Sequence, residues 1–386
     1  MQAPVITTTS GRAVRRHVLG VDLVLVSAAI LAAIIGVVMV YSATRGELVA
    51  AGTSPTYYMK RQLIFLVIGV VCMVALAILD YRRLESVGYV LYGLSVFLLL
   101  AVMVPGVGSS TLGAQRWFRL GPLELQPSEF AVLALIIAVA TYCSRRNEGL
   151  AWRDVIRLLI MAGIPIGLVL VQPDLGTAII MTIVLLVMLA AAGLPNRILV
   201  MLLVGAVLVV IVAVEAGLVH HYQITRITIF LKQDTTHLTK LEQTHIYNLQ
   251  QAKSAIGSGG LFGKGLLHGA QTNLGYVPEQ RTDFIFSAVG EQLGFVGATA
   301  VLAVLAVVAW RILRAGQLSR DSFGRLMCTG IFMFLAFSTF QNAGMNMGIM
   351  PITGIPLPFI SYGGTAVIAF FMGVGIALSV YARRTG

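Results

Sequence analysis

A single carboxylate stands where a polar loop meets a long apolar segment. The loop ends with PEQRTDFIF (278–286), which places Asp283 directly before the apolar residues. A carboxylate at a boundary between water and hydrocarbon is partly desolvated, and desolvation tunes it to act as a base. We therefore expect Asp283 to carry chemistry on a lipid-borne substrate. An Asp at this point also suits the N-cap of the following helix, and the two roles can coexist.

The composition is that of an integral membrane protein. Hydrophobic residues make up 58% of the chain and charged residues only 11%, whereas soluble domains carry roughly 25% charged residues. The net charge of +11 is compatible with nucleic acid, but the positive side chains flank apolar segments, which argues against such a partner. Cys72, Cys143 and Cys328 lie in apolar segments without disulfide or metal spacing, so we expect them to be packing residues.

The apolar segments predict an all-α polytopic membrane protein with about ten transmembrane helices. The predicted spans are residues 20–41, 62–79, 87–105, 129–143, 155–171, 176–192, 197–219, 284–313, 325–345 and 359–381. Arginines gather in the segments that are cytoplasmic if the N-terminus is cytoplasmic, so the positive-inside rule places both termini there. We expect one membrane domain over residues 1–386, with a cytoplasmic tail (1–19) and a large extracytoplasmic loop (220–283) between helices 7 and 8.

The outer loops contain three further patterns. In loop 106–128, Gly and Pro turns surround Trp117, which we expect to be an anchor at the membrane interface. Residues 238–255 have helical spacing and predict an amphipathic helix that lies on the membrane surface or lines a groove. The following GSGGLFGKG (257–265) lacks the preceding strand and the Ser or Thr of a P-loop. It argues against a nucleotide site and leaves a flexible backbone that approaches a ligand.

Four acidic residues lie within or beside the predicted spans, where a charge is expensive. Glu215 and Glu291 are the deepest, and Glu129 and Asp174 stand at outer boundaries. Snorkelling or a hydrogen bond between helices explains Glu215 as well as a functional role does. Glu129 falls in the first turn of its predicted helix, where the helix dipole stabilises a carboxylate.

Four motif segments follow one another along the chain, and all lie on the predicted outer side. They are GAQRWF (113–118) with QPSEF (126–130); QPDLGT (172–177); AIGSGGLFGKG (255–265) with PEQRTDFIF (278–286); and GIPLPFISYGG (354–364). With these segments the chain resembles the SEDS family (shape, elongation, division and sporulation) over nearly its whole length. The Gln280-Arg281 pair and Thr353-Gly354 favour the RodA branch over the FtsW branch.

The resemblance implies a peptidoglycan glycosyltransferase that polymerises lipid II at the outer face of the bacterial cytoplasmic membrane, for elongation and rod shape. It implies a class B penicillin-binding protein, a transpeptidase, as partner, together with elongation-complex proteins and membrane lipid. The essential Asp of the family falls on Asp283. The alternatives are a lipid II flippase or other transporter, a division polymerase of the FtsW type, and a scaffold that only recruits the transpeptidase.

The chain departs from the family pattern at Val132, where a Lys is usual. The ion pair expected between that Lys and Glu129 cannot form. Glu129 must then be protonated, paired with another cation, or exposed to water, because an unpaired buried carboxylate is costly. Arg116 is the first candidate for a replacement cation.

The chemistry that the resemblance implies requires one base at the attacking hydroxyl and positive charge at a leaving diphosphate. We expect Asp283 to be the general base of an inverting displacement, with Arg281 as the best placed cation. The candidate substrate-binding residues are Glu129, Arg116, Arg226, Lys232, Lys264, Glu279, Gln280, Arg281, Ser361 and Tyr362. A divalent cation, Mg²⁺ or Mn²⁺, is expected as a possible cofactor without assigned ligands, and no organic cofactor is expected. The Pro-rich segment 354–364 is either a re-entrant segment that faces Asp283 or a rigid turn.

Overall fold

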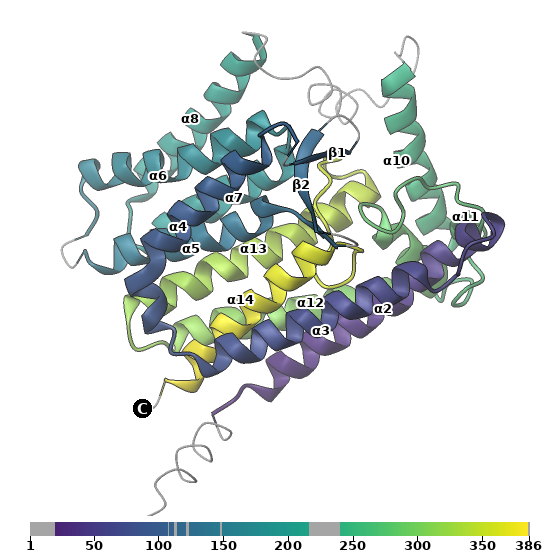
Figure 1. Ribbon diagram of the computed structural model, residues 1–386, viewed down its shortest axis with the longest axis horizontal. Helices are drawn as coiled ribbons and strands as arrows, with labels where there is room; N and C mark the ends of the chain where they lie inside the picture. The colour runs from purple at the N-terminus through teal and green to yellow at the C-terminus, as the bar shows by residue number, and fades with distance from the viewer. Residues whose placement is uncertain are drawn as a thin grey trace, which may run out of the picture.

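The computed structural model describes residues 20–106, 108–111, 114–120, 123–146, 149–215 and 240–384. Within this part, eight helices are long and apolar enough to cross a membrane, and α7 and α8 add shorter apolar helices. These helices are α2 (Leu23–Ala50), α3 (Tyr57–Ile78), α4 (Arg82–Val102), α5 (Pro127–Ser144), α6 (Trp152–Val171), α7 (Leu175–Ala191), α8 (Asn196–Glu215), α12 (Ile285–Gln317), α13 (Ser322–Met347) and α14 (Gly364–Ala382). The predicted class, a helical polytopic membrane protein, is confirmed, with one helix for each predicted span (Figure 1).

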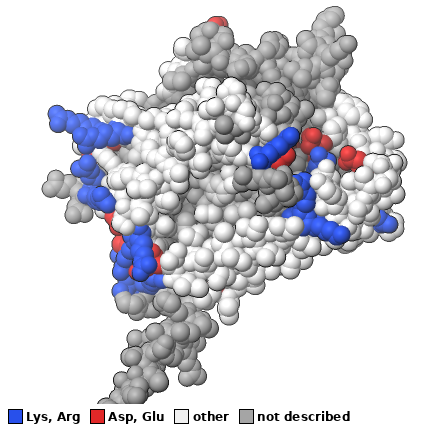
Figure 2. Space-filling view, in the orientation of Figure 1, with Lys and Arg blue, Asp and Glu red and all other residues white. Residues whose placement is uncertain are grey.

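The centre of the bundle is formed by α5, α13 and α14. Of the most apolar window of α5, 83% is buried, against 22% for α3 and for α4. A helix that is apolar all round and surrounded by protein belongs in the core, whereas exposed apolar faces suit contact with lipid. Figure 2 shows Lys and Arg gathered at two ends of the molecule with an uncharged belt between them. That distribution is the one expected of a bundle that spans a bilayer.

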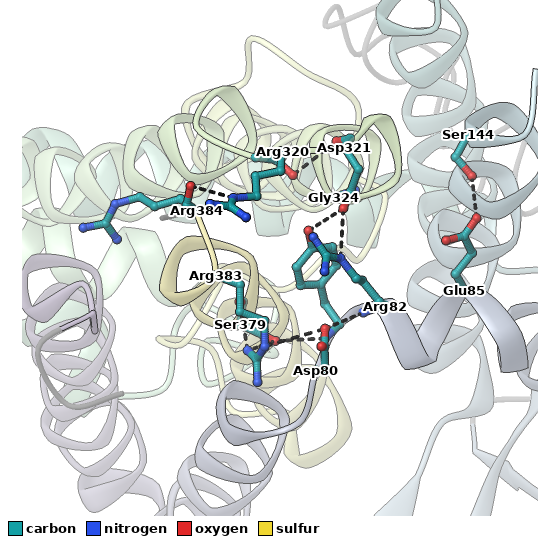
Figure 3. Close-up of polar contacts among 12 residues, drawn as sticks. Asp80, Arg82, Glu85, Ser144, Arg320, Asp321, Gly324, Ser379, Arg383 and Arg384 are labelled. Atoms are coloured by element: carbon teal, nitrogen blue, oxygen red, sulfur yellow. Dashed lines mark hydrogen bonds and ion pairs between the residues drawn. The ribbon is translucent and has the colours of Figure 1, made fainter. Parts of the chain in front are cut away.

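One end of the bundle, here called the arginine-rich end, is fastened by polar contacts between the α3–α4 turn and the helices α13 and α14 (Figure 3). The hydroxyl of Tyr81 donates to Asp321 Oδ2 at 2.6 Å. Burial, and next the hydrogen bond to Asp321, raise the pKa of the Tyr81 phenol, so it remains a donor. Ser379 Oγ accepts from the Tyr81 backbone N–H at 3.1 Å and from Arg383 at 2.8 Å.

A small antiparallel sheet covers the opposite end, where sequence analysis expected only turns. Its strands are β1 (Ser109–Thr111), β2 (Ala114–Leu120) and β3 (Leu123–Leu125), in the order β1-β2-β3. Ser109 is paired with Trp117, and Phe118 with Leu125. β1 and β3 have only 3 residues each, and the 7 residues of β2 (AQRWFRL) do not alternate between apolar and polar, so the pattern did not predict strands here. The role of Trp117 as an interfacial anchor stays a prediction.

The predicted amphipathic helix is present as α10 (Lys240–Ser258), followed by the short α11 (Ala270–Asn273). Its Ile246, Leu249 and Ala252 are buried, and the helix packs on α12 and α13. Leu249 and Ala252 share a small apolar cluster with Val277, Phe284, Met345 and Ile352. The apolar face of α10 therefore packs on α12 and α13 close to Phe284, and Figure 1 shows the helix standing at one end of the bundle.

The glycine-rich segment before α11 packs into a break in α12. Gly294 has non-helical backbone angles inside that helix, with φ of 67°. The N–H groups of Phe295 and Val296, which the break releases, donate to the carbonyls of Gly260 and Leu261 at 2.9 and 3.0 Å. The glycines therefore permit a close approach of backbone to backbone, since a side chain has no room there.

We expect Gly263→Ala to destabilise the protein. Gly263 has φ of +79°, and a Cβ atom there would lie 2.2 Å from the carbonyl oxygen of Gln292. Such backbone strain costs roughly 1–3 kcal/mol before any clash is counted. Thermal unfolding in detergent measures the effect. Gly257→Ala is the control, because nothing lies within 4 Å of its added Cβ atom; an equal unfolding temperature for both variants would contradict this account of the break.

Candidate functional site

The first two motif segments are joined by side-chain contacts at one end of the bundle, here called the motif end. Arg116, on β2, donates through Nε to the carbonyl of Gln172 at 2.6 Å and through a terminal nitrogen to the carbonyl of Pro173. Gln126 Nε2 donates to Asp174 Oδ2 at 2.9 Å. Asp174 in turn caps α7, because its Oδ1 accepts from the backbone N–H of Thr177 at 3.2 Å.

The last two motif segments meet at the same end. Ser361 Oγ donates to the carbonyl of Thr282 at 2.7 Å, and the backbone N–H of Tyr362 donates to the carbonyl of Arg281 at 2.8 Å. The hydroxyl of Thr365 accepts from the N–H of Gln126 at 3.0 Å, which ties the last segment to the first. Segments far apart in the sequence thus meet at this end, and the segment before α14 contacts residues 281 and 282.

Asp283 is half-buried and lies one residue before the N-cap of α12, which is Phe284. The prediction that Asp283 is the N-cap residue is therefore wrong by one position, because the helix begins at Ile285. The backbone carbonyl of Asp283 accepts hydrogen bonds from Asn342 Nδ2 and Asn346 Nδ2, each at 3.0 Å. Two buried amides on α13 thereby fix the main chain at Asp283, independently of its carboxylate. Sequence reasoning missed both, although amides inside an apolar span are themselves a functional signal.

Arg281 lies beside a group of tyrosines. Its guanidinium stands 4.6 Å from the centre of the Tyr58 ring, and its side chain is 26% exposed, with Glu47 Oε2 at 3.8 Å. The Tyr58 ring meets the Tyr362 ring edge-on, with centroids 5.1 Å apart. Of the predicted substrate-binding residues, the structure therefore brings Arg281, Ser361 and Tyr362 together next to Asp283.

Lys264 and Gln280 take part in a network around Glu291, which is fully buried in α12. Lys264 Nζ lies 3.0 Å from Glu291 Oε1. Glu291 Oε2 accepts from the hydroxyl of Thr272 at 2.6 Å, and that hydroxyl accepts from Gln280 Nε2 at 3.2 Å. Through Thr272, the Glu291 network holds Gln280 and therefore the loop that leads into Arg281 and Asp283. Glu279, by contrast, is exposed.

Glu129 is 6% exposed and lies in the first turn of α5, as predicted. The replacement of the missing Lys by Arg116 is wrong, because Arg116 donates to the carbonyls of residues 172 and 173 instead. In the part of the chain that the structure describes, no cation forms an ion pair with Glu129. Val132, one turn along α5, is buried.

The remaining predicted positions divide into two groups. Arg226 and Lys232 lie outside the described residues. Glu215, at the end of α8, is exposed rather than buried. Among the described residues there is no group of three or more His, Cys, Asp and Glu side chains that could hold a metal ion.

Comparison with known proteins assigns the fold and the motifs to one family. The sequence profile of the cell cycle proteins FtsW, RodA and SpoVE matches residues 22–386. The chain belongs to this family. Within it, the chain is 36% identical to a probable peptidoglycan glycosyltransferase FtsW of Trichlorobacter lovleyi, over 94% of this chain and 93% of the relative. It is 37% identical to the peptidoglycan glycosyltransferase MrdB of Escherichia coli, over 84% of this chain and 86% of that one.

Solved structures of family members have the same fold. The RodA crystal structure of Thermus thermophilus, a rod shape determining protein, superposes with a TM-score of 0.70 at 30% identity, over 95% of this chain and 98% of that one. A chain of a peptidoglycan synthase complex, described for its coordination of polymerization and crosslinking, gives a TM-score of 0.77 at 31% identity over the same shares. The expectation of a SEDS-type protein is therefore confirmed.

Proposed function

We propose that this chain is a peptidoglycan glycosyltransferase that polymerises lipid II at the outer face of the bacterial cytoplasmic membrane, with both termini in the cytoplasm. The observation that carries the proposal is the meeting of the motif segments at one end of the bundle, where the last segment contacts residues 281 and 282 beside the half-buried Asp283. The FtsW and MrdB relatives, which are named peptidoglycan glycosyltransferases, support it.

The proposed reaction is a single displacement at the anomeric carbon of one lipid-linked sugar. The hydroxyl of the second lipid-linked sugar forms the new carbon–oxygen bond, and its proton passes to Asp283. The bond between the anomeric carbon and the diphosphate breaks, and the electron pair leaves with the polyprenyl diphosphate. Attack from the opposite face inverts the centre, so one carboxylate base is sufficient and no covalent intermediate is needed.

Hydrogen bonds to the main chain of residues 282 and 283 orient the base, Asp283, in this mechanism. The carbonyl of Asp283 is held by two amides that are themselves buried in α13, and the preceding carbonyl of Thr282 is held by Ser361. A base that is positioned before substrate binds does not have to be ordered during the reaction. Positive charge at the leaving diphosphate comes from this chain's own cations, with Arg281 the nearest in sequence.

Polymerisation and transport make different demands on the site. A flippase needs access to its substrate from both leaflets and a site near the middle of the bilayer, whereas the motif contacts lie at one end of the bundle. The test is product sizing after purified protein is incubated with lipid II in detergent. Glycan polymer supports the proposal, and its absence from folded protein contradicts it.

The finer role is elongation, with a class B penicillin-binding protein as the transpeptidase partner and other elongation-complex proteins nearby. The Gln280-Arg281 pair favours this branch over division. The relatives include FtsW and MrdB at similar identity. Expression of this chain in strains depleted of their own elongation or division polymerase distinguishes the two roles. Restoration of rod shape supports elongation, while restoration of septation alone indicates an FtsW-type protein.

Dependence of polymerisation on Mg²⁺ or Mn²⁺ is also proposed, and chelation followed by metal addition tests it.

Asn346→Ala should slow polymerisation without changing the base. The variant removes one of two amides on the Asp283 carbonyl and the acceptor for the Ser287 N–H. If the loss of this contact raises the activation free energy by roughly 1.4 kcal/mol, the rate of polymerisation falls about tenfold. Ser338→Ala, which removes a buried hydroxyl bonded only within α13, is the control. If both variants polymerise equally fast, this hydrogen bond to the main chain does not contribute to the reaction.

A further inference from the structure

The first turn of α3 carries the wrong charge for its place in the helix. The N-terminus of a helix is the positive end of its dipole, so acidic side chains are favoured there by about 0.3–1 kcal/mol each. The first turn of α3 has no acidic residue, and its N-cap Thr56 makes no side-chain cap. Lys60 and Arg61 follow within about one turn instead. A conflict of this kind between local preference and observed residues is typical of a functional site.

Arg61 is incompletely satisfied by the protein. One terminal nitrogen donates to the hydroxyl of Tyr57 at 3.1 Å, but its buried Nε has no hydrogen-bond partner among the described residues. An unpaired buried donor on a guanidinium is costly, more so than on a neutral group. An anion that accepted from Nε would remove this cost.

Arg281 brings a second guanidinium to the same place. The Tyr57 and Tyr58 rings are 5.1 Å apart, Tyr58 meets Tyr362 at the same separation, and Arg281 lies over Tyr58. Arg281 is paired with Glu47, whose side chain is 64% exposed and whose Oε2 lies 3.8 Å from the guanidinium. Pairs with so exposed a partner contribute about 0–1 kcal/mol, so this contact does not prevent Arg281 from binding a further anion.

Gln62 supplies a different feature, an acceptor without a donor. The residue is 1% exposed, and its Nε2 donates to the carbonyl of Ser361 at 3.1 Å, which puts the carboxamide next to Tyr362. Its Oε1 has no partner among the described residues. A ligand that completes this site therefore carries an anionic group and a hydrogen-bond donor, which a sugar hydroxyl can supply.

We propose that Arg61, Arg281 and Gln62, with the rings of Tyr58 and Tyr362, bind the diphosphate and the adjoining sugar of a polyprenyl-linked substrate. The two guanidiniums lie on the phosphate oxygens, and Gln62 Oε1 accepts from a sugar hydroxyl. This inference rests on the proposed polymerase function and adds the residues that hold the leaving group. The site lies beside Asp283, because Arg281 and Tyr362 are joined through their backbones. A phospholipid headgroup offers the same phosphate chemistry without the sugar.

The test is a binding measurement on the full-length purified protein, which needs no catalysis. The probes are undecaprenyl diphosphate, phosphatidylglycerol and lipid II, each presented in detergent micelles and measured by native mass spectrometry. We expect Arg61→Gln to weaken undecaprenyl diphosphate binding about tenfold or more, as charge-assisted hydrogen bonds to phosphate are strong. Gln62→Ala should weaken lipid II binding more than undecaprenyl diphosphate binding, because only lipid II carries the sugar.

Arg119→Gln is the control, since Arg119 is an exposed arginine at the same end with a side chain that is 59% exposed. Wild-type affinity in folded Arg61→Gln, or an equal loss in the control, overturns the proposal. So does a site that binds phosphatidylglycerol as tightly as undecaprenyl diphosphate. If Arg61→Gln unfolds, Arg281→Gln is measured in its place with the same criteria. Diphosphate binding that depends on these arginines in a protein that makes no polymer would contradict the polymerase function and leave the binding site standing.

Discussion

Asp283→Asn should abolish the polymerisation of lipid II by purified, folded protein. Asn has nearly the same shape as Asp but cannot accept the proton of the attacking hydroxyl, and a general base contributes ~10²–10⁴-fold to a rate. Gel analysis of glycan products made in detergent measures the loss. Polymer formed at the wild-type rate would contradict the assignment of Asp283 as the base.

The structure allows this loss to be separated from unfolding. The contacts from Asn342, Asn346 and Ser361 reach main-chain carbonyls of residues 282 and 283, so the substitution leaves them in place. The unfolding temperature and the binding of lipid II are measured on the same variant, and a loss of polymerisation in protein that still folds and binds identifies the loss of the base. Asp80→Asn is the matched control, because it makes the same chemical change at the arginine-rich end, where Asp80 pairs with Arg383 at 3.6 Å.

Glu291→Gln should produce the second largest effect, a loss of both stability and activity. The Glu291 carboxylate accepts from Lys264 Nζ, from the N–H groups of Gln271 and Thr272, and from the Thr272 hydroxyl. An amide in its place turns an NH₂ group toward one of these donors and leaves Lys264 without its counter-charge. Removing one partner of a fully buried ion pair costs about 3–5 kcal/mol, and we expect a smaller loss here because the Lys264 side chain is 33% exposed.

Activity should fall with stability because the same network holds Gln280, which directly precedes Arg281 and lies close to Asp283 in the sequence. Thermal unfolding and polymerisation are measured on the same preparation. Glu215→Gln is the control, since this second acid of the apolar segments is exposed and exposed substitutions usually fall within about 0.5 kcal/mol. Equal unfolding temperatures for the two variants would show that the Glu291 network does not stabilise the loop.

The two acids of the predicted spans illustrate how far a pattern reaches. Sequence analysis could say that Glu215 and Glu291 are costly in lipid, but it could not distinguish them, because their partners are set by packing. Glu291 meets Lys264 across the break in α12, whereas Glu215 ends a helix at the surface. Similarly, the mismatch at Val132 was visible in the sequence, but the commitment of Arg116 to the carbonyls of Gln172 and Pro173 was not.

What the sequence by itself determined was local in origin. Hydropathy located the membrane helices, helical spacing located α10, and the switch from polar to apolar residues marked Asp283, because each signal depends on neighbours along the chain. The tertiary structure alone decided that the α13 amides Asn342 and Asn346 and the Ser361 hydroxyl meet at residues 282 and 283, and that Gln62 of α3 reaches the carbonyl of Ser361. Those groups are up to about 300 residues apart, and only the packing of the helices determines which of them come within hydrogen-bonding distance.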